Sequence, residues 1–303
     1  MYDLTICIPT YKRPLSLNRL IRSIGQCRFD ISLIKKVNIL IVDNDTNFSA
    51  RSTADKLIAE FSGVFEIYYY EYTVKGLSNV RNELIRRGLL LNPDFLVFID
   101  DDEYVTKEWI SSLVETIINN NADAARGPVV AIAEEKCPDR IWCWFSRESY
   151  PDGSRIYSFT TGNLILRVTS LKKYNIWFDN RFNLTGFEDS YFGIQMIKKG
   201  SVIYWSDKSV AYESIPGNRT TLRWLMLRTY NSAITYTYML KLEKEYLKLS
   251  KKIAVSTLYL IVGLLAFSFI PFPFKRRYWG LIKASEGVGG FAGLFNIKYY
   301  EYK

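Results

Sequence analysis

The chain has 303 residues, a length that allows one large domain or two small ones. Hydrophobic residues make up 48% and aromatic residues 16%, so a sizeable core is expected and general disorder is excluded. The chain contains no histidine, which excludes Ser-His-Asp triads, Cys–His nucleophiles and His-ligated zinc, and leaves oxygen ligands for any bound metal.

The positive charge of the chain is concentrated in its last third. The net charge is +9, yet residues 1–204 hold 25 basic and 25 acidic side chains, while residues 205–303 hold 15 basic and 6 acidic ones. Such a segment is typical of a nucleic-acid-binding tail or of a surface that lies on a membrane.

The four cysteines lack CxxC spacing, and no signal peptide precedes the first predicted strand. We therefore expect reduced thiols and a cytoplasmic location.

The first predicted elements form a strand–helix–strand unit. Residues 4–10 (LTICIPT) predict a short apolar strand, residues 17–24 have apolar side chains at helical spacing, and residues 37–44 (VNILIVDN) predict a second strand. This order and spacing indicate a βαβ unit with a parallel pair of strands. The second strand ends in Asp43 and Asn44. Polar groups at this position commonly bind a nucleoside, and a plain polar turn is the alternative.

A third strand and a second helix follow. Residues 66–73 (EIYYYEYT) predict the strand, and residues 75–88 (KGLSNVRNELIRRG) predict a helix that ends at Gly88. Arg81 lies early in this helix, where the helix dipole does not favour a cation. It either contacts a phosphate or a base, or simply faces solvent.

The strand that organises the chain runs into an acidic cluster. Residues 95–99 (FLVFI) are an unbroken apolar run, which is typical of a strand buried on both faces, and Asp100, Asp101, Asp102 and Glu103 follow at its carboxyl end. Open α/β sheets bind their ligands at this end. If the strand geometry continues, Asp100 and Asp102 face the same side and favour a divalent cation. The alternative is a solvated acidic turn.

The middle of the chain continues the α/β pattern. Residues 105–117 predict a helix, residues 125–132 a strand, and residues 160–167 (TTGNLILR) a glycine turn that enters another strand. No GxGxxG follows a strand and no GxxxxGK[ST] is present, which argues against a dinucleotide-binding enzyme and a P-loop enzyme. Glu188 and Asp189 begin a further helix, where the dipole favours ionised acids. Helices use acids there routinely, so the pair alone does not identify a site.

A set of six motifs resembles a known family. The motifs are PTYKRP, IVDND, GLSNVRN, FIDDDE, TTGNL and GFEDSYF. In this order and at these spacings they resemble the family 2 glycosyltransferases with the GT-A fold, over about residues 3–230. The resemblance implies an α/β fold with a Rossmann-like, mostly parallel sheet. It also implies a hexosyltransferase that uses a nucleotide-sugar donor and inverts the anomeric carbon.

The resemblance further implies roles for individual residues. Asp102 would hold a Mn²⁺ or Mg²⁺ ion on the donor diphosphate, and Asp189, with Glu188 beside it, would take the proton of the acceptor hydroxyl. Glu213 stands in the region where many GT-A enzymes place a metal-binding histidine, and either replaces that ligand or is structural. Residues 220–224 read TTLRW in place of the QxxRW of processive synthases, which favours single addition. The candidate nucleotide-binding residues are Pro9, Thr10, Tyr11, Arg13, Asp43, Asn44, Arg81, Asp100 and Asp101.

The last part of the chain is of a different kind. Residues 220–250 predict a long helix, and residues 253–274 form an uncharged run that is long enough to span a bilayer. Basic clusters flank this run on both sides, so a re-entrant helix or one lying in the membrane plane satisfies the positive-inside rule better than a span. A buried core helix is the soluble alternative. Residues 277–300, rich in aromatic and small side chains, predict a second membrane-surface helix.

These observations predict three parts: a GT-A catalytic domain (1–219), a connecting helix (220–251) and membrane-associated helices (252–303). The predicted function is transfer of a sugar from a nucleotide-diphosphate donor to a lipid-linked saccharide at the cytoplasmic face of the inner membrane, with a UDP-sugar as the expected donor. Surface polysaccharide or glycan synthesis is the expected setting, without a nucleic-acid partner and with a possible homo-oligomer. The alternatives are a catalytically silent sugar-nucleotide-binding subunit on the membrane and a nucleotidyltransferase. The latter would need a glycine-rich phosphate loop, which YKRP does not supply.

Overall fold

The computed structural model describes residues 1–146, 149–268 and 274–300. The chain divides into two compact units. The first contains Met1–Ile132, Arg147–Asn180 and Glu188–Ser214, and the second contains Ala133–Ser146, Arg181–Phe187 and Ile215–Lys303. The expected division at residues 219 and 251 is a functional one, which compactness does not test, and it stays a prediction.

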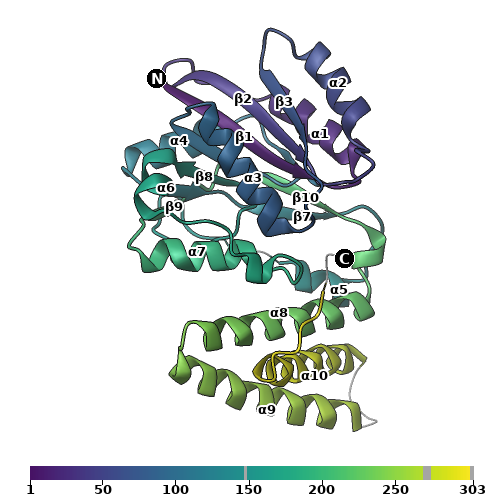
Figure 1. Ribbon diagram of the computed structural model, residues 1–303. Coiled ribbons are helices and arrows are strands. Elements are labelled where there is room, and N and C mark those ends of the chain that lie inside the picture. The colour runs from purple at the N-terminus through teal and green to yellow at the C-terminus, as the bar shows by residue number, and fades with distance from the viewer. Residues whose placement is uncertain (147–148, 269–273, 301–303) are drawn as a thin grey trace. The chain divides into compact units, whose positions relative to one another are not determined.

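A seven-stranded, mostly parallel sheet forms the centre of the first unit (Figure 1). Its order is β3-β2-β1-β4-β8-β6-β9. The four N-terminal strands pair in parallel, while β8 runs antiparallel to both of its neighbours. The expected α/β class with a mostly parallel sheet is thereby confirmed. The bounds are β1 (Tyr2–Thr10), β2 (Ile34–Asp43), β3 (Glu66–Glu71), β4 (Phe95–Phe98), β6 (Ala124–Arg126), β8 (Leu164–Arg167) and β9 (Ile203–Trp205).

Alternating side chains of the central strands supply two cores, one on each face of the sheet. In β4, Phe95 and Val97 join one buried cluster, and Leu96 and Phe98 join the other. This alternation is the two-residue period of a strand buried on both faces. Helices α1 (Pro14–Gly25), α2 (Arg51–Glu60) and α4 (Trp109–Asn119) contribute to the first cluster. Helices α3 (Leu77–Leu90), α6 (Val168–Tyr174) and α7 (Glu188–Lys198) contribute to the second.

A small second sheet has the order β5-β10-β7. Its strands are β5 (Glu103–Val105), β10 (Ala211–Ile215) and β7 (Val129–Ala133). The single strand expected at residues 125–132 is therefore two strands, β6 and β7, which belong to different sheets. The break falls at Gly127, where a Cβ atom would stand 2.1 Å from the carbonyl oxygen of Ser209, so only glycine fits this close approach.

Three long helices dominate the second unit: α8 (Leu222–Leu242), α9 (Tyr246–Ser268) and α10 (Phe274–Leu294). The helix expected over residues 220–250 is interrupted, because Lys244 has a φ of 56° and the chain turns there into α9. Helix α10 lies between the other two (Figure 1). Its glycines permit the contact: a Cβ atom on Gly289 would meet the carbonyl oxygen of Tyr230 in α8, and one on Gly287 would meet Ser256 in α9. The short helices are α5 (Asp139–Trp142), η1 (Cys143–Phe145), η2 (Asn180–Phe182) and η3 (Gly217–Arg219).

Helix α9 carries the apolar run expected from the sequence. Within the described residues, Tyr246–Ala266 is the one helical segment that is long and apolar enough to cross a membrane, by length and composition. Leu258, Ile261 and Leu265 are each more than half exposed on it. Residues 269–273 of the expected run lie outside the described residues. The run is thus not a buried core helix within this unit, and its relation to a membrane stays a proposal.

Candidate active site

The candidate site lies at the carboxyl ends of β1 and β4, which are neighbours in the sheet. Open α/β sheets bind ligands at this edge. Strand β1 ends with the half-buried Pro9 and the buried Thr10, and the exposed Tyr11 follows. The backbone then turns at Lys12, whose φ is 57°. This turn directs the segment before α1 toward residues 100–103 after β4.

Asp101 joins these two segments. Its Oδ2 atom accepts hydrogen bonds from Thr10 Oγ1 at 2.8 Å and from the Tyr11 backbone nitrogen at 3.3 Å, and its Oδ1 accepts one from Arg13 Nη1 at 2.9 Å. Arg13 Nη1 also contacts Asp102 Oδ2 at 2.7 Å. Burial raises the pKa of Asp101 to about 6, although Arg13 lowers it. Because protein groups already bind both oxygens, Asp101 holds the site together, and a nucleotide contact by it or by Arg13 stays a prediction.

The acidic residues do not continue the strand. The Glu103 backbone nitrogen donates to the Asp100 carbonyl oxygen at 3.1 Å, which closes a turn. The expectation that Asp100 and Asp102 share a side rested on continued strand geometry and is wrong on that point. Instead Asp101 and Asp102 share Arg13, while Asp100 faces the other way, toward α3.

Glu103 is buried among other carboxylates. It lies opposite Glu213 in the β5–β10 pair, and one of its oxygens accepts from the Asp100 backbone nitrogen at 3.2 Å. Burial, and then the charges of Asp100, Glu213 and Asp102, raise the pKa of Glu103 well above its usual range. Gly162 leaves room for this side chain, because a Cβ atom there would stand 2.9 Å from Glu103 Oε1 and would force it to shift. Neither Glu103 nor Gly162 was among the candidates from the sequence, although both lie in the quoted motifs.

The carboxylate cluster bears on the expected metal. Across the described residues, no three Asp, Glu, Cys or His side chains are arranged to hold an ion by themselves. The donor chemistry nevertheless fits an oxygen-preferring divalent cation, since burial and then the charges of three neighbouring carboxylates raise the pKa of Glu103. Asp102 and Glu213 both belong to this cluster. Their assignment as metal ligands stays a prediction.

Arg81 links the acidic turn to the start of α7. Its Nη2 atom contacts Asp100 Oδ1 at 3.1 Å, and its Nη1 atom pairs with Glu188 Oε1. The Arg81 side chain is only 6% exposed and lies near the ring of Phe178. The guanidinium is thus a buried connection between two carboxylates rather than a solvent-facing group. A nucleotide contact by Arg81 stays a prediction.

The acidic pair begins α7 as expected. The two residues before it have left-handed backbone, with φ of 75° at Gly186 and 79° at Phe187, and the latter is strained for a bulky side chain. Glu188 is buried, and within the described residues its Oε2 atom has no hydrogen-bond partner. Burial raises its pKa to about 7, although Arg81 lowers it, and Asp189 adds to the rise. Asp189 is half-buried, and its Oδ1 accepts from the Ser190 backbone nitrogen at 2.6 Å.

Asp43 and Asn44, at the end of β2, are held by the protein. Asp43 is buried and accepts hydrogen bonds from Tyr69 Oη at 2.7 Å and from the backbone nitrogens of residues 45 and 50. Asn44 donates to the carbonyl oxygens of Tyr72 at 2.6 Å and Val74 at 2.9 Å. These bonds fix the loops after β2 and β3. The expected nucleoside contacts stay predictions.

Asn163 of the TTGNL motif fastens the neighbouring loops. Its Oδ1 accepts from Trp109 Nε1 at 2.7 Å, and its Nδ2 donates to the carbonyl oxygens of Pro128 at 2.9 Å and Ser209 at 2.6 Å. No role was predicted for Asn163 from the sequence. Its left-handed backbone, with a φ of 57°, is a conformation that asparagine tolerates well.

A mostly parallel sheet with a cluster of carboxylates at its carboxyl edge is the arrangement of the GT-A glycosyltransferases. Residues 5–174, more than half of the chain, match the family described as Glycosyl transferase family 2. The chain belongs to glycosyltransferase family 2, and the resemblance of its motifs is confirmed.

Three relatives illustrate the similarity. The succinoglycan biosynthesis protein ExoM of Rhizobium meliloti (strain 1021) is 28% identical over 256 residues, which cover 84% of this chain and 80% of ExoM. The structure of S. aureus TarS 1–349 with UDP-GlcNAc has a TM-score of 0.55 at 15% identity and covers 100% of this chain and 94% of that one. GalNAc-T7 with UDP, GalNAc and Mn²⁺ has a TM-score of 0.57 at 13% identity, over 78% of this chain and 51% of that one. At these identities the two structures show the fold alone.

Proposed function

We propose that this protein is an inverting glycosyltransferase that moves a sugar from a UDP-sugar to a lipid-linked saccharide in polysaccharide synthesis. Family membership supports the transfer, and the similarity to ExoM, a succinoglycan biosynthesis protein, supports the polysaccharide setting. The TarS structures with UDP-GlcNAc and UDP, and GalNAc-T7 with UDP, support the donor class.

One observation carries this proposal. Arg81 connects Asp100, in the acidic turn after β4, to Glu188, next to Asp189 at the start of α7. The transfer needs two groups of carboxylates, one near the donor diphosphate and one near the acceptor hydroxyl. A single buried guanidinium bound to both groups fixes their relative positions, as near-attack alignment of donor and acceptor requires.

Asp189 is the proposed general base. It is half-buried, whereas Glu188 is buried and paired with Arg81, so Asp189 is the member of the pair that an acceptor can reach. Its carboxylate would take the acceptor proton as the oxygen attacks the anomeric carbon. One base and one direct displacement invert the configuration at that carbon. Glu188 then acts by positioning the start of α7.

The proposed cofactor is Mn²⁺ or Mg²⁺, held by Asp102 and Glu213. When bound, the cation neutralises charge that develops on the departing diphosphate. Asp102 lies in the turn just before β5 and Glu213 lies in β10, and these two strands pair directly at Glu103 and Glu213. Arg13, which contacts Asp101 and Asp102, adds a fixed positive charge at the same edge of the sheet.

The second unit supports the proposed acceptor class. Helix α9 exposes apolar side chains over a length that can span or lie in a bilayer, and the excess positive charge lies in this part of the chain. An enzyme held at the cytoplasmic face of the inner membrane meets a lipid-linked acceptor in a thin layer instead of in bulk solution.

The test is a screen for donor hydrolysis by the purified full-length protein. UDP-sugars and sugars on other nucleotides are offered with Mn²⁺, with Mg²⁺ and with EDTA. We expect hydrolysis of one UDP-sugar that EDTA abolishes and added Mn²⁺ restores. Donor binding without any turnover, with or without an acceptor, would instead indicate a silent binding subunit.

A further inference from the structure

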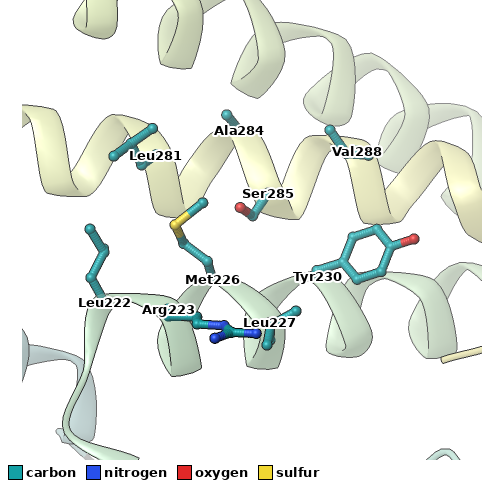
Figure 2. Close-up of a pocket in the computed structure, with 9 residues that line it drawn as sticks. All are labelled: Leu222, Arg223, Met226, Leu227, Tyr230, Leu281, Ala284, Ser285 and Val288. Carbon is teal, nitrogen blue, oxygen red and sulfur yellow. The ribbon is translucent and has the colours of Figure 1, made fainter. Parts of the chain in front are cut away.

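A hollow of about 510 Å³ lies between α8 and α10 in the second unit (Figure 2). Apolar side chains from both helices make up most of its lining, among them Met226 and Leu227 of α8 and Leu281 and Val288 of α10. Figure 2 shows Met226 pointing from α8 toward α10. Leu227 is 37% exposed and Val288 48% exposed, so apolar surface faces solvent inside the hollow.

Arg223 is the charged member of the lining. The described lining contains one basic side chain and no acidic one. Arg223 stands in the first turn of α8, where the helix dipole disfavours a cation, so its charge does not serve helix stability. In Figure 2 its guanidinium runs along α8 beside Leu227. One end of the groove is therefore cationic and the remainder apolar.

We propose that this groove binds the lipid anchor of the acceptor, with the first part of the hydrocarbon chain on the apolar lining and the anchor phosphate on Arg223. The inference rests on the proposed lipid-linked acceptor. Charge complementarity supports this occupant, because an anchor with a phosphate at one end of an apolar chain matches a groove with one guanidinium at one end. Arg223 to Tyr230 spans roughly 10 Å of helix, at about 1.5 Å per residue, so the groove holds only the part of the chain nearest the phosphate.

A protein partner would be recognised differently. A helix docked in a groove needs several polar groups at the rim as well as apolar anchors, and an acidic partner would need more than one cation. The lining has a single hydroxyl, Ser285, and a single cation, Arg223, apart from the phenol of Tyr230. So few polar groups in the lining suit a ligand with one charged group and a hydrocarbon chain.

The experiment labels the groove directly. The full-length protein in phosphatidylcholine nanodiscs is irradiated with dodecyl phosphate that carries a diazirine in its chain, and labelled peptides are mapped by mass spectrometry. We expect labels within residues 222–230 and 281–288. The same diazirine on dodecanol, which lacks the phosphate, should label these segments much less.

Two variants and a control sharpen the result. Val288→Trp fills the groove from an exposed position and should reduce labelling several-fold, whereas Val255→Trp, at a 39% exposed position of α9 outside the lining, should not. Arg223→Gln should lower labelling by the phosphate probe about tenfold, the value of one charge-assisted hydrogen bond, and leave the dodecanol probe unchanged.

Two results would overturn the proposal: labels confined to α9, or equal labelling by both probes that Arg223→Gln does not change. Either result would mean that ordinary membrane lipid occupies the groove. Hydrolysis of the UDP-sugar in the same preparations reports the proposed function separately, since no groove residue belongs to the carboxylate site. Intact hydrolysis with labels outside the groove overturns the groove alone. Absent hydrolysis in the wild type overturns the proposed function.

Discussion

Arg81 and Glu188 form a buried ion pair although they are 107 residues apart in the sequence. The pair ties α3 to the start of α7, and Asp100 binds the same guanidinium. Removing one member of a buried ion pair leaves the other charge uncompensated, which is far more costly than the net worth of the pair. The relative position of the two acidic groups therefore depends on one side chain.

Arg81→Gln should destabilise the protein strongly. The change leaves Glu188 buried without its partner, and we expect a loss of about 3–5 kcal/mol in the free energy of unfolding, measured by urea denaturation. Arg86→Gln is the matched control on the same helix: Arg86 also pairs with a glutamate, but its side chain is 58% exposed, so we expect a loss below about 1 kcal/mol. Equal losses in the two variants would show that the buried Arg81 pair contributes no more to the free energy of unfolding than the exposed Arg86 pair.

The ionisation of Glu188 should make stability depend on pH. Burial raises its pKa from 4.5 to about 7, so between these values the folded protein holds a proton that the unfolded chain has released. The stabilisation is complete below pH 4.5 and is lost as pH rises through about 7. Because Glu188→Gln cannot titrate, its free energy of unfolding should fall less than that of the wild type between pH 5 and pH 7.5. Parallel curves for the two proteins would remove Glu188 as the source.

Asp189→Asn should keep donor binding and lose transfer. Only proton removal is lost, and general-base loss is typically worth ~10²–10⁴ in rate. Donor affinity by calorimetry and transfer rate with a saturating acceptor separate the two effects. If Glu188→Gln abolishes transfer in a folded protein while Asp189→Asn remains active, the base is Glu188 and the assignment must be exchanged.

Asp102→Asn should abolish transfer and weaken Mn²⁺-dependent UDP binding. The change removes one negative charge from the proposed metal site, so less of the diphosphate charge is neutralised. Asp55→Asn, at an exposed position of α2, is the control for loss of one carboxylate elsewhere. Wild-type turnover of Asp102→Asn at saturating Mn²⁺ would exclude Asp102 from metal binding.

The periodic features of this fold can be predicted from its sequence. The run Phe95–Ile99 predicted a strand buried on both faces, and its alternate side chains do join two cores. The acidic start of α7 could also be predicted, because the interaction of acids with a helix N-terminus is local. What could not be predicted is the partner of each charge. The turn at residues 100–103 redirects Asp100 toward Arg81, and no local pattern reveals that the same guanidinium pairs with Glu188, 107 residues further along the chain.

Two further features escaped prediction for the same reason. The break at Gly127 depends on a carbonyl group of Ser209, which only the folded chain brings near. The second unit recruits Ala133–Ser146 and Arg181–Phe187 from the middle of the sequence. Neither segment has a periodic signal of its own, since each is short and contains only brief helical turns.

Polar substitutions on α9 should release the protein from membranes. Leu258, Ile261 and Leu265 are 55%, 52% and 51% exposed, and burial of the exposed half of each in a bilayer is worth roughly 1 kcal/mol. Changing all three to Gln should move the protein to the soluble fraction after ultracentrifugation. A control that exchanges Leu and Ile at the same positions keeps the apolar surface and should stay with the membrane.

High salt should not release the wild type from the membrane, because salt screens surface charge but does not weaken apolar burial.

The α9 variant should keep hydrolysis of the UDP-sugar, since the acidic turn and the start of α7 belong to the other unit. Its transfer to a lipid-linked acceptor should fall much further than its transfer to a soluble analogue, because it no longer meets the lipid in a thin layer. Complete release of the wild type by salt alone would mean that basic side chains are its membrane contact. A soluble acceptor would then become the better hypothesis.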